Sequence, residues 1–168
     1  MTKENKMREI KIEKVTLSIG GTAENLEKGV KLLERITNRK AARKKSTKRI
    51  PSLGVRPGLE VGCMITLRDE EATETLRRML VAINNILKRK QISENSFSFG
   101  VKEYIEIPGV QYQRDIGMIG LDVTVTFVRP GKRIERKKIK SGKIPKRQRV
   151  SEEEIIKFME DNFKVKFN

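Results

Sequence analysis

Residues 121–127 alternate strictly between apolar and polar side chains. Successive side chains of a β-strand point to opposite faces, so a period of two predicts a strand with one buried and one solvated face. Residues 10–19 and 60–68 show the same alternation, with Ser and Thr among their polar members. Strands of this kind are typical of antiparallel sheets that are covered on one face only. The pattern therefore favours an antiparallel-type sheet.

Segments with helical periodicity predict the elements that cover this sheet. Residues 24–37 place Leu26, Val30, Leu33 and Ile36 on one stripe, and the longest predicted helix runs from Asp69 to about Lys90. Residues 151–154 match a capping box that opens a terminal helix. With 168 residues and no repeat, we expect one α+β domain over residues 1–168, with helices packed on one face of the sheet and residues 1–7 flexible.

Three further features refine the predicted strands. The first strand changes phase between Ile12 and Val15, and a bulge near Glu13 would reconcile its two halves. We expect another strand over residues 96–107, whose Phe residues pack in the core. The one cysteine, Cys63, is in phase with the apolar face of residues 60–68, so we interpret it as a small core residue.

The excess of positive over negative charge lies in two segments of the chain. The formal net charge is +16, of which residues 39–49 carry +7 and residues 132–149 carry +9. A charge run is often only a solvated surface, but like charges within each segment repel, and only Glu135 opposes them there. We therefore expect the segments to order only against a polyanion, with counterion release on binding. Prolines and glycines in residues 50–58 mark a loop, so we predict two basic loop extensions, over residues 39–58 and 132–149.

Composition argues against catalysis. The chain has no His and one Cys, which excludes internal disulfides and the usual Cys/His zinc sites. It has no phosphate-binding glycine motif and no paired acid and base, so we expect neither catalytic residues nor a cofactor. Because no apolar run approaches the roughly 18–20 residues of a membrane span, we expect a soluble, intracellular protein.

Hydroxyl side chains recur on the polar faces of the predicted strands, at Thr16, Ser18, Thr66, Thr124 and Thr126. Thr suits any solvated sheet face, which is the simpler explanation. Between two basic segments, however, the same face becomes a candidate platform for RNA, since hydroxyls bond to ribose and phosphate groups. No aromatic residue alternates on that face, which argues against base stacking.

Four segments occur in an order that is similar to a known family. They are MREIKIEKV at 7–15, GCMITLR at 62–68, FSFGV at 97–101 and GLDVTVTF at 120–127. Together they resemble large-subunit ribosomal protein five, the family that binds 5S ribosomal RNA, and KIPKRQRV at 143–150 resembles its archaeal branch. The resemblance extends from about residue 7 to the C-terminus.

The resemblance implies a structural constituent of the large subunit, located in the central protuberance of cytoplasmic ribosomes. It implies contacts with 5S and large-subunit ribosomal RNA, with P-site tRNA, with a small-subunit head protein at an intersubunit bridge, and with a neighbouring 5S-RNA-binding protein. No membrane partner is implied.

The resemblance and the basic segments together give two sets of expected site residues. The set expected to bind ribosomal RNA is Ser18, Gly20, Arg39, Lys40, Thr66, Arg68, Thr124, Lys137, Lys138, Lys146 and Arg147. The set expected to contact tRNA is Lys44, Lys45, Lys48, Arg49 and Arg56. The chain departs from the family at three places: Ser18 replaces an Asn, residues 37–41 replace a Gly-Gln-Lys-Pro turn, and Leu53 replaces an aromatic residue.

Two other functions follow from charge alone. A general nucleic-acid chaperone or DNA-compacting protein would need only the basic segments. A membrane-surface protein would need an amphipathic basic helix with exposed aromatic residues, and Gly142 and Pro145 interrupt the second segment.

Overall fold

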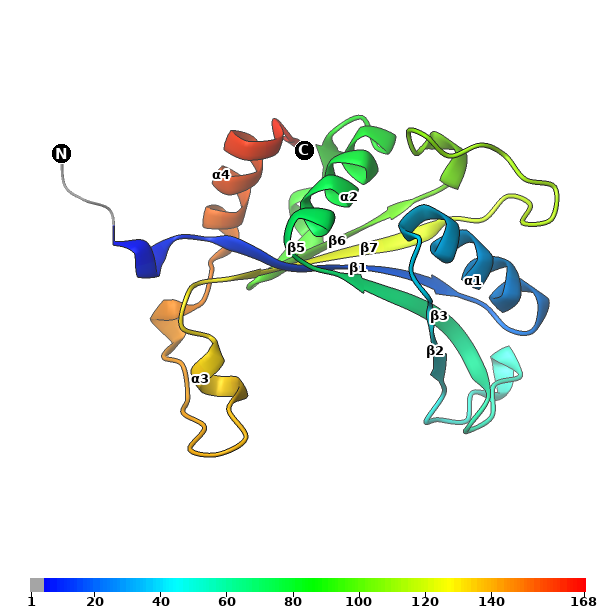
Figure 1. Cartoon of the computed structure of the whole chain (residues 1–168), viewed down its shortest axis with the longest axis horizontal. Helices are drawn as coiled ribbons and strands as arrows, with labels where there is room; N and C mark the ends of the chain where they lie inside the picture. The colour runs from blue at the N-terminus through cyan, green and yellow to red at the C-terminus, as the bar shows by residue number, and fades with distance from the viewer. Residues whose placement is uncertain (1–4) are drawn as a thin grey trace.

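The computed structural model describes residues 5–168, and its centre is a six-stranded sheet in the order β2-β3-β1-β7-β6-β5 (Figure 1). The strands are β1 (Lys11–Gly20), β2 (Ala42–Lys45), β3 (Glu60–Leu67), β5 (Ile92–Ser93), β6 (Ser96–Val101) and β7 (Leu121–Val128). All five pairings in this sheet are antiparallel. A second, two-stranded parallel sheet joins β4 (Ile86–Leu87) to β8 (Lys166–Phe167), which the sequence did not indicate.

Three helices cover one face of the large sheet: α1 (Glu24–Thr37), α2 (Asp69–Ala82) and α4 (Glu152–Phe163) (Figure 1). A short fourth helix, α3 (Arg133–Arg136), lies away from them. Within residues 5–168, five 3-10 helices span Lys6–Arg8, Pro51–Leu53, Arg89–Gln91, Tyr104–Glu106 and Lys146–Gln148. The predicted α+β fold with helices on one face is confirmed. The expected flexibility of residues 1–7 falls partly on residues 1–4, which lie outside the described residues.

One core lies between this helical layer and the sheet. There α1 packs on the apolar sides of β3 and β1, and α2 packs on β1. Val15, Val125, Leu33 and Leu76 have no exposed surface. All four residues of the predicted α1 stripe are buried. Burying apolar side chains contributes roughly 1.5–3 kcal/mol for each large residue, so this layer holds the sheet rigid. No helix within residues 5–168 is long and apolar enough to cross a membrane.

The bulge predicted in the first strand is present. In the pairing of β1 with β7, Ile12 is opposite Phe127 and Lys14 is opposite Thr126, which leaves Glu13 as an inserted residue. The insertion restores the phase that places Val15 in the core.

The predicted length of α2 is wrong. The helix ends at Ala82, not near Lys90, and both Asn84 and Asn85 adopt a left-handed backbone with φ of 55°. Asn tolerates this conformation better than most residues, so the chain turns there and enters β4. Residues 88–90 therefore lie outside the helix, directly after β4.

The strand predicted over residues 96–107 is also too long. β6 ends at Val101, and Tyr104–Glu106 form a 3-10 turn. Tyr104 is buried, and its hydroxyl accepts a hydrogen bond from the backbone N–H of Gln113 at 2.9 Å. The expected core role of Phe97 and Phe99 is confirmed, because both are buried and stack at 5.9 Å between ring centroids.

Candidate RNA-binding surface

The face of the large sheet opposite α1, α2 and α4, here called the open face, carries a row of hydroxyls across four strands. Thr16 on β1 is opposite Thr66 on β3 and opposite Thr124 on β7, and Thr124 is opposite Ser98 on β6. The neighbouring odd-numbered positions of these strands take the core face, which directs the row outward. The predicted hydroxyl face is therefore present as a continuous, uncharged strip.

The next rows of the open face have small residues, Ser18 and Gly20, on β1. Ser18 is opposite Met64 on one side and Asp122 on the other, and Gly20 is opposite Gly62. Gly20 is exposed, and a Cβ built on it would meet no atom within 4 Å. A flat surface of this kind allows a bulky partner to approach the backbone closely.

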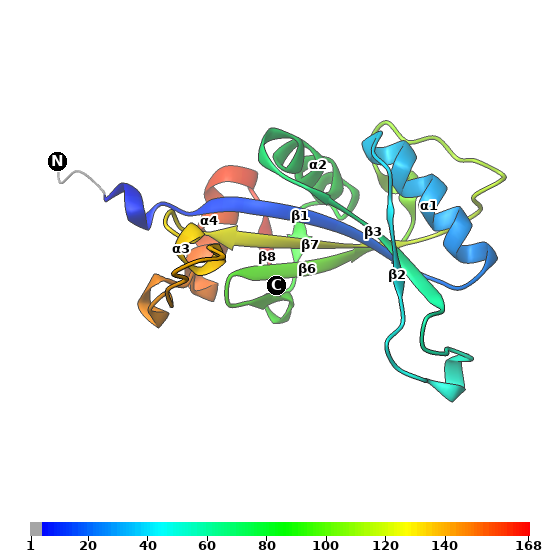
Figure 2. The same ribbon diagram turned by 60° about the horizontal axis from the view of Figure 1, so that its bottom comes forward.

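Both predicted basic extensions project from the side of the open face, at opposite ends of the sheet (Figures 1 and 2). The first basic extension, residues 39–58, contains β2 and the turn that leads to β3. The second basic extension, residues 132–149, contains α3 and the 3-10 helix Lys146–Gln148. The hydroxyl row lies between them, so positive charge flanks an uncharged strip.

The first basic extension is more ordered than a loop. Residues 42–45 form the edge strand β2 on β3, and Arg43 makes ion pairs with Glu27 at 2.8 Å and Glu60 at 3.1 Å. These pairs raise the pKa of Arg43, chiefly through its hydrogen bond to Glu60. Acids distant in sequence thus offset part of the charge of this segment. That the segment orders only against a polyanion stays a prediction.

The residues expected to contact tRNA remain free for a partner. All five are exposed, and none makes an ion pair with any residue from 5 to 168; they are Lys44, Lys45, Lys48, Arg49 and Arg56. The turn that carries three of them is held by backbone hydrogen bonds from Ser46 to Leu59 and from Gly58 to Ser46, both at 2.8 Å. The structure thus presents these cations on a hairpin.

Arg39 and Lys40 lie apart from the hydroxyl row, at the turn after α1. The helix ends at Asn38 in a left-handed conformation, and Arg39 then makes an ion pair with Glu71 of α2 at 2.7 Å. Arg39 is thus directed toward the helical side, although half of its side chain stays exposed. Arg68 is exposed at the end of β3, two residues beyond Thr66. Arg39 was expected to bind ribosomal RNA together with Ser18 and Thr66, and the structure separates it from them.

The second basic extension divides into paired and free cations. Lys132 and Arg136 pair with Glu13, and Arg149 pairs with Glu94 at 2.9 Å. The expected RNA-binding residues Lys137, Lys138, Lys146 and Arg147 are exposed, and in the described part of the chain they make no ion pair. Arg133, Lys140 and Lys143 are also exposed and make no ion pair within residues 5–168. These three were missing from the set expected to bind ribosomal RNA.

Two open-face residues also escaped prediction. Ser98 extends the hydroxyl row onto β6, and Lys14 lies opposite Thr126 at its margin. The alternation of Ser and Phe over residues 96–99 was the available signal for Ser98, but the two Phe residues drew the interpretation toward the core alone.

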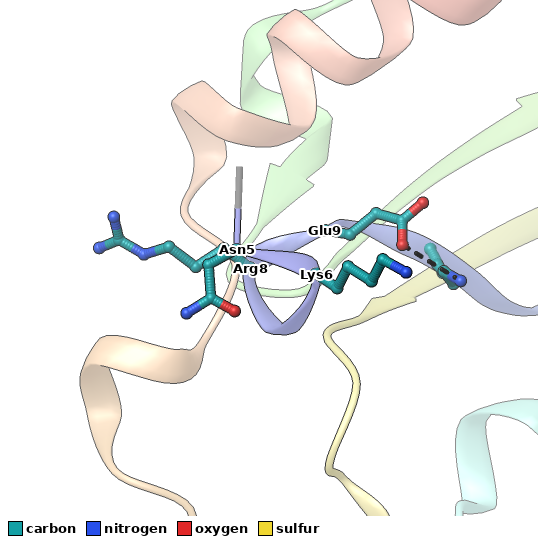
Figure 3. Close-up of a pocket in the computed structure, with 5 residues that line it drawn as sticks. Asn5, Lys6, Arg8 and Glu9 are labelled. Carbon is teal, nitrogen blue, oxygen red and sulfur yellow. Dashed lines mark ion pairs between the residues drawn. The ribbon is translucent and has the colours of Figure 1, made fainter. Parts of the chain in front are cut away.

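The described residues show no arrangement suited to catalysis. Residues 5–168 contain no group of three or more His, Cys, Asp or Glu that could hold a metal ion. Cys63 is 2% exposed, and burial raises the pKa of its thiol. A hollow beside the first 3-10 helix is lined by Asn5, Lys6, Arg8, Glu9 and Lys11, but Arg8 points away from Lys6 and Glu9 (Figure 3). Its polar groups do not converge on a common point.

Known proteins of one family are similar to this chain. The family model described as "ribosomal protein L5" matches residues 5–56, and the model for the C-terminus of the same ribosomal family matches residues 60–158. Proteins named "large ribosomal subunit protein uL5" are similar over nearly the full chain. The one from Nanoarchaeum equitans is 42% identical, covering 96% of this chain and 98% of its own. The one from Methanobrevibacter smithii is 40% identical, covering 97% and 98%, and the one from Sulfolobus acidocaldarius is 42% identical, covering 97% and 93%.

The fold and these matches define a ribosomal protein, a structural and non-enzymatic constituent of the ribosome. The chain belongs to the ribosomal protein L5 family. The expected resemblance and the expected absence of enzymatic activity are both confirmed.

Proposed function

We propose that this protein is a constituent of the large ribosomal subunit that binds 5S ribosomal RNA on its open face, within the central protuberance. One observation carries the proposal: an uncharged hydroxyl row lies between two basic extensions that project from the same side of the sheet. The names of its relatives support the large subunit as its place.

The two kinds of surface have different tasks in this proposal. Exposed Lys and Arg side chains release counterions from the phosphate backbone and supply most of the affinity, without sequence preference. Thr and Ser hydroxyls are neutral and directional, so they hydrogen-bond to ribose 2′-OH groups and phosphates only where the RNA shape fits. The hydroxyl row and the small residues around Gly20 therefore select the RNA that the extensions attract.

The extensions serve different partners. The second basic extension binds large-subunit ribosomal RNA through its free cations, while the first basic extension reaches P-site tRNA through Lys44, Lys45, Lys48, Arg49 and Arg56. The family resemblance further supports contacts with a small-subunit head protein and with a neighbouring 5S-RNA-binding protein. These partner assignments rest on the resemblance and on the free charges.

A filter-binding titration tests the specific part of the proposal. With 6–10 phosphate contacts, affinity for 5S ribosomal RNA should fall by roughly 10³–10⁵ between 50 and 200 mM salt. An unrelated structured RNA of equal length should bind much more weakly at every salt concentration. Equal affinity for both RNAs would contradict the proposal, and comparable affinity for duplex DNA would favour a general nucleic-acid chaperone or DNA-compacting protein.

A further inference from the structure

Glu13 is the inserted residue of the β1 bulge, and its carboxylate is buried with a side chain only 8% exposed. Oε2 accepts a hydrogen bond from the Lys132 ammonium at 3.1 Å, and Oε1 pairs with the Arg136 guanidinium. A buried carboxylate is strongly unfavourable unless it is paired, so the two cations stabilise the Glu13 carboxylate in this position. The N-terminal root of the second basic extension is thereby held against β1.

The C-terminal root of the same extension is held by separate contacts. The backbone N–H of Val150 donates to Asn95 Oδ1 at 2.8 Å, and Arg149 pairs with Glu94 at 2.9 Å. Gln148 Nε2 donates to the Met7 carbonyl at 3.1 Å. The exposed cations of residues 137–147 therefore lie on a segment that is fixed at both ends (Figures 1 and 2). Glu13 of β1 holds its N-terminal end, and Glu94 and Asn95 hold its C-terminal end.

We infer that Glu13 is a positioning residue: through Lys132 and Arg136 it fixes the pose of the second basic extension before RNA arrives. The inference rests on the proposed RNA-binding role of that extension. An extension ordered only by its ligand loses conformational freedom at the moment of binding, which weakens the complex. Because Glu13 fixes the N-terminal end of the extension in advance, less conformational freedom is lost on binding. Glu13 is negatively charged, yet it should strengthen the binding of a polyanion.

The sign of this effect separates the inference from simple electrostatics. Glu13→Gln removes one negative charge, so attraction alone predicts equal or tighter binding of 5S and large-subunit ribosomal RNA. Loss of the positioning contacts predicts weaker binding, by roughly tenfold in Kd. Glu9→Gln is the matched control: it makes the same charge change on an exposed residue whose ion pair, with Lys11 at 3.2 Å, lies outside the extension. Glu9→Gln should bind RNA as tightly as the unmodified protein or more tightly.

Glu13→Asp guards against a global effect of the first substitution. It keeps the charge but shortens the side chain by one methylene, so it should also weaken RNA binding, while circular dichroism and the urea midpoint confirm folding. Equal or tighter RNA binding by a folded Glu13→Gln or Glu13→Asp variant would overturn the inference.

A readout without RNA distinguishes this inference from the proposed function. Trypsin should cut within residues 132–149 faster in Glu13→Gln than in Glu9→Gln, because the released extension is rich in Lys and Arg. Unchanged cleavage would overturn the positioning role. A fourfold variant changes the free cations of the extension to Gln: Lys137, Lys138, Lys146 and Arg147. It should bind large-subunit ribosomal RNA weakly, and adding Glu13→Gln to it should not weaken that binding further. If that fourfold variant bound RNA normally, the proposed function of the extension would fail, whatever the trypsin result.

Discussion

Arg129 at the end of β7 donates to both carboxylate oxygens of Glu154 in the first turn of α4, at 2.5 and 2.6 Å. Arg129 is 7% exposed, and Glu154 also accepts a hydrogen bond from the backbone N–H of Ser151, which completes the predicted capping box. The Glu154 carboxylate thus joins two parts of the chain that flank the second basic extension. Arg129 lies just before this extension, and the start of α4 lies just after it.

Glu154→Gln should lower the free energy of unfolding by about 1.5–3 kcal/mol, as judged by urea denaturation. Breaking a fully buried ion pair costs about 3–5 kcal/mol. The loss of stability should be smaller here because the Glu154 side chain is 41% exposed and solvent screens the pair. Glu153→Gln removes the same charge from the same helical turn and should cost only about 0.3–1 kcal/mol. Equal losses in the two variants would show that Arg129 contributes nothing.

The same carboxylate makes stability depend on pH. Burial raises the pKa of Glu154, but hydrogen bonds from the Ser151 backbone and from Arg129 outweigh burial and hold the pKa below its ordinary value of 4.5. A depressed folded-state pKa gives stability that is present above the unfolded-state pKa and lost as pH falls through the folded-state value. The urea midpoints of the unmodified protein and Glu154→Gln should therefore converge below about pH 4.5. A constant difference between pH 7 and pH 3 would contradict this.

Gly20→Val should reduce affinity for 5S ribosomal RNA by roughly tenfold, about 1.4 kcal/mol, because it places a branched side chain on the flat part of the open face. Stability should change little, since the added Cβ meets no atom within 4 Å and Val favours strands. Filter binding and urea denaturation measure the two effects separately. A variant that binds normally would place the RNA elsewhere on the molecule.

Thr66→Val keeps the shape of the side chain and removes its hydroxyl from the row. Loss of one neutral hydrogen bond, about 0.5–1.5 kcal/mol, should weaken 5S RNA binding by roughly 2- to 13-fold without altering its salt dependence. Thr73→Val on α2, a helix on the opposite face, is the control and should leave RNA affinity unchanged.

Neutralising Lys44, Lys45 and Lys48 with Gln should instead weaken tRNA binding in reassembled ribosomes. The salt slope of that binding should fall by roughly two to three, because each phosphate contact contributes about 0.7–0.9. Affinity for 5S ribosomal RNA should stay nearly the same. If 5S RNA binding fell as much as in Thr66→Val, the division between the open face and the first basic extension would be wrong.

Cys63 should resist alkylation in the folded protein. Its thiol is buried between β3 and α1, lies 3.2 Å from the position of a Cβ on Gly29, and has a raised pKa because of burial. The reactive species is the thiolate, so both access and ionisation are suppressed. Mass spectrometry after treatment with iodoacetamide should find modification only when urea unfolds the chain; rapid labelling without urea would contradict this.

The sequence predicted those elements whose residues carry their own periodicity. The α1 helix and the β1 bulge were found in this way, because burial of Leu33 and Val15 imposes a pattern that is visible locally. The end of α2 was missed because Ile83 and Leu87 continue its helical spacing, although Asn84 and Asn85 offered a local turn signal. The β2 strand was missed because residues 42–45 have no alternation and take their order from β3.

The same distinction applies to the candidate site. The hydroxyl row followed from alternation within single strands, whereas the state of each cation depends on acids elsewhere in the chain. Glu13 is 119 residues from Lys132, and Glu94 is 55 residues from Arg149. Local sequence could show how much charge each extension carries, but not which charges are already paired.

The edge position of β2 has a consequence for the free protein. Its outer side ends the sheet with unpaired N–H and C=O groups, a template on which a second chain could add a strand. Residues 42–45 place Arg43, Lys44 and Lys45 along this edge, and two identical edges of this kind repel each other. The lysines proposed to attract tRNA would thus also keep newly made copies from aggregating edge to edge before assembly.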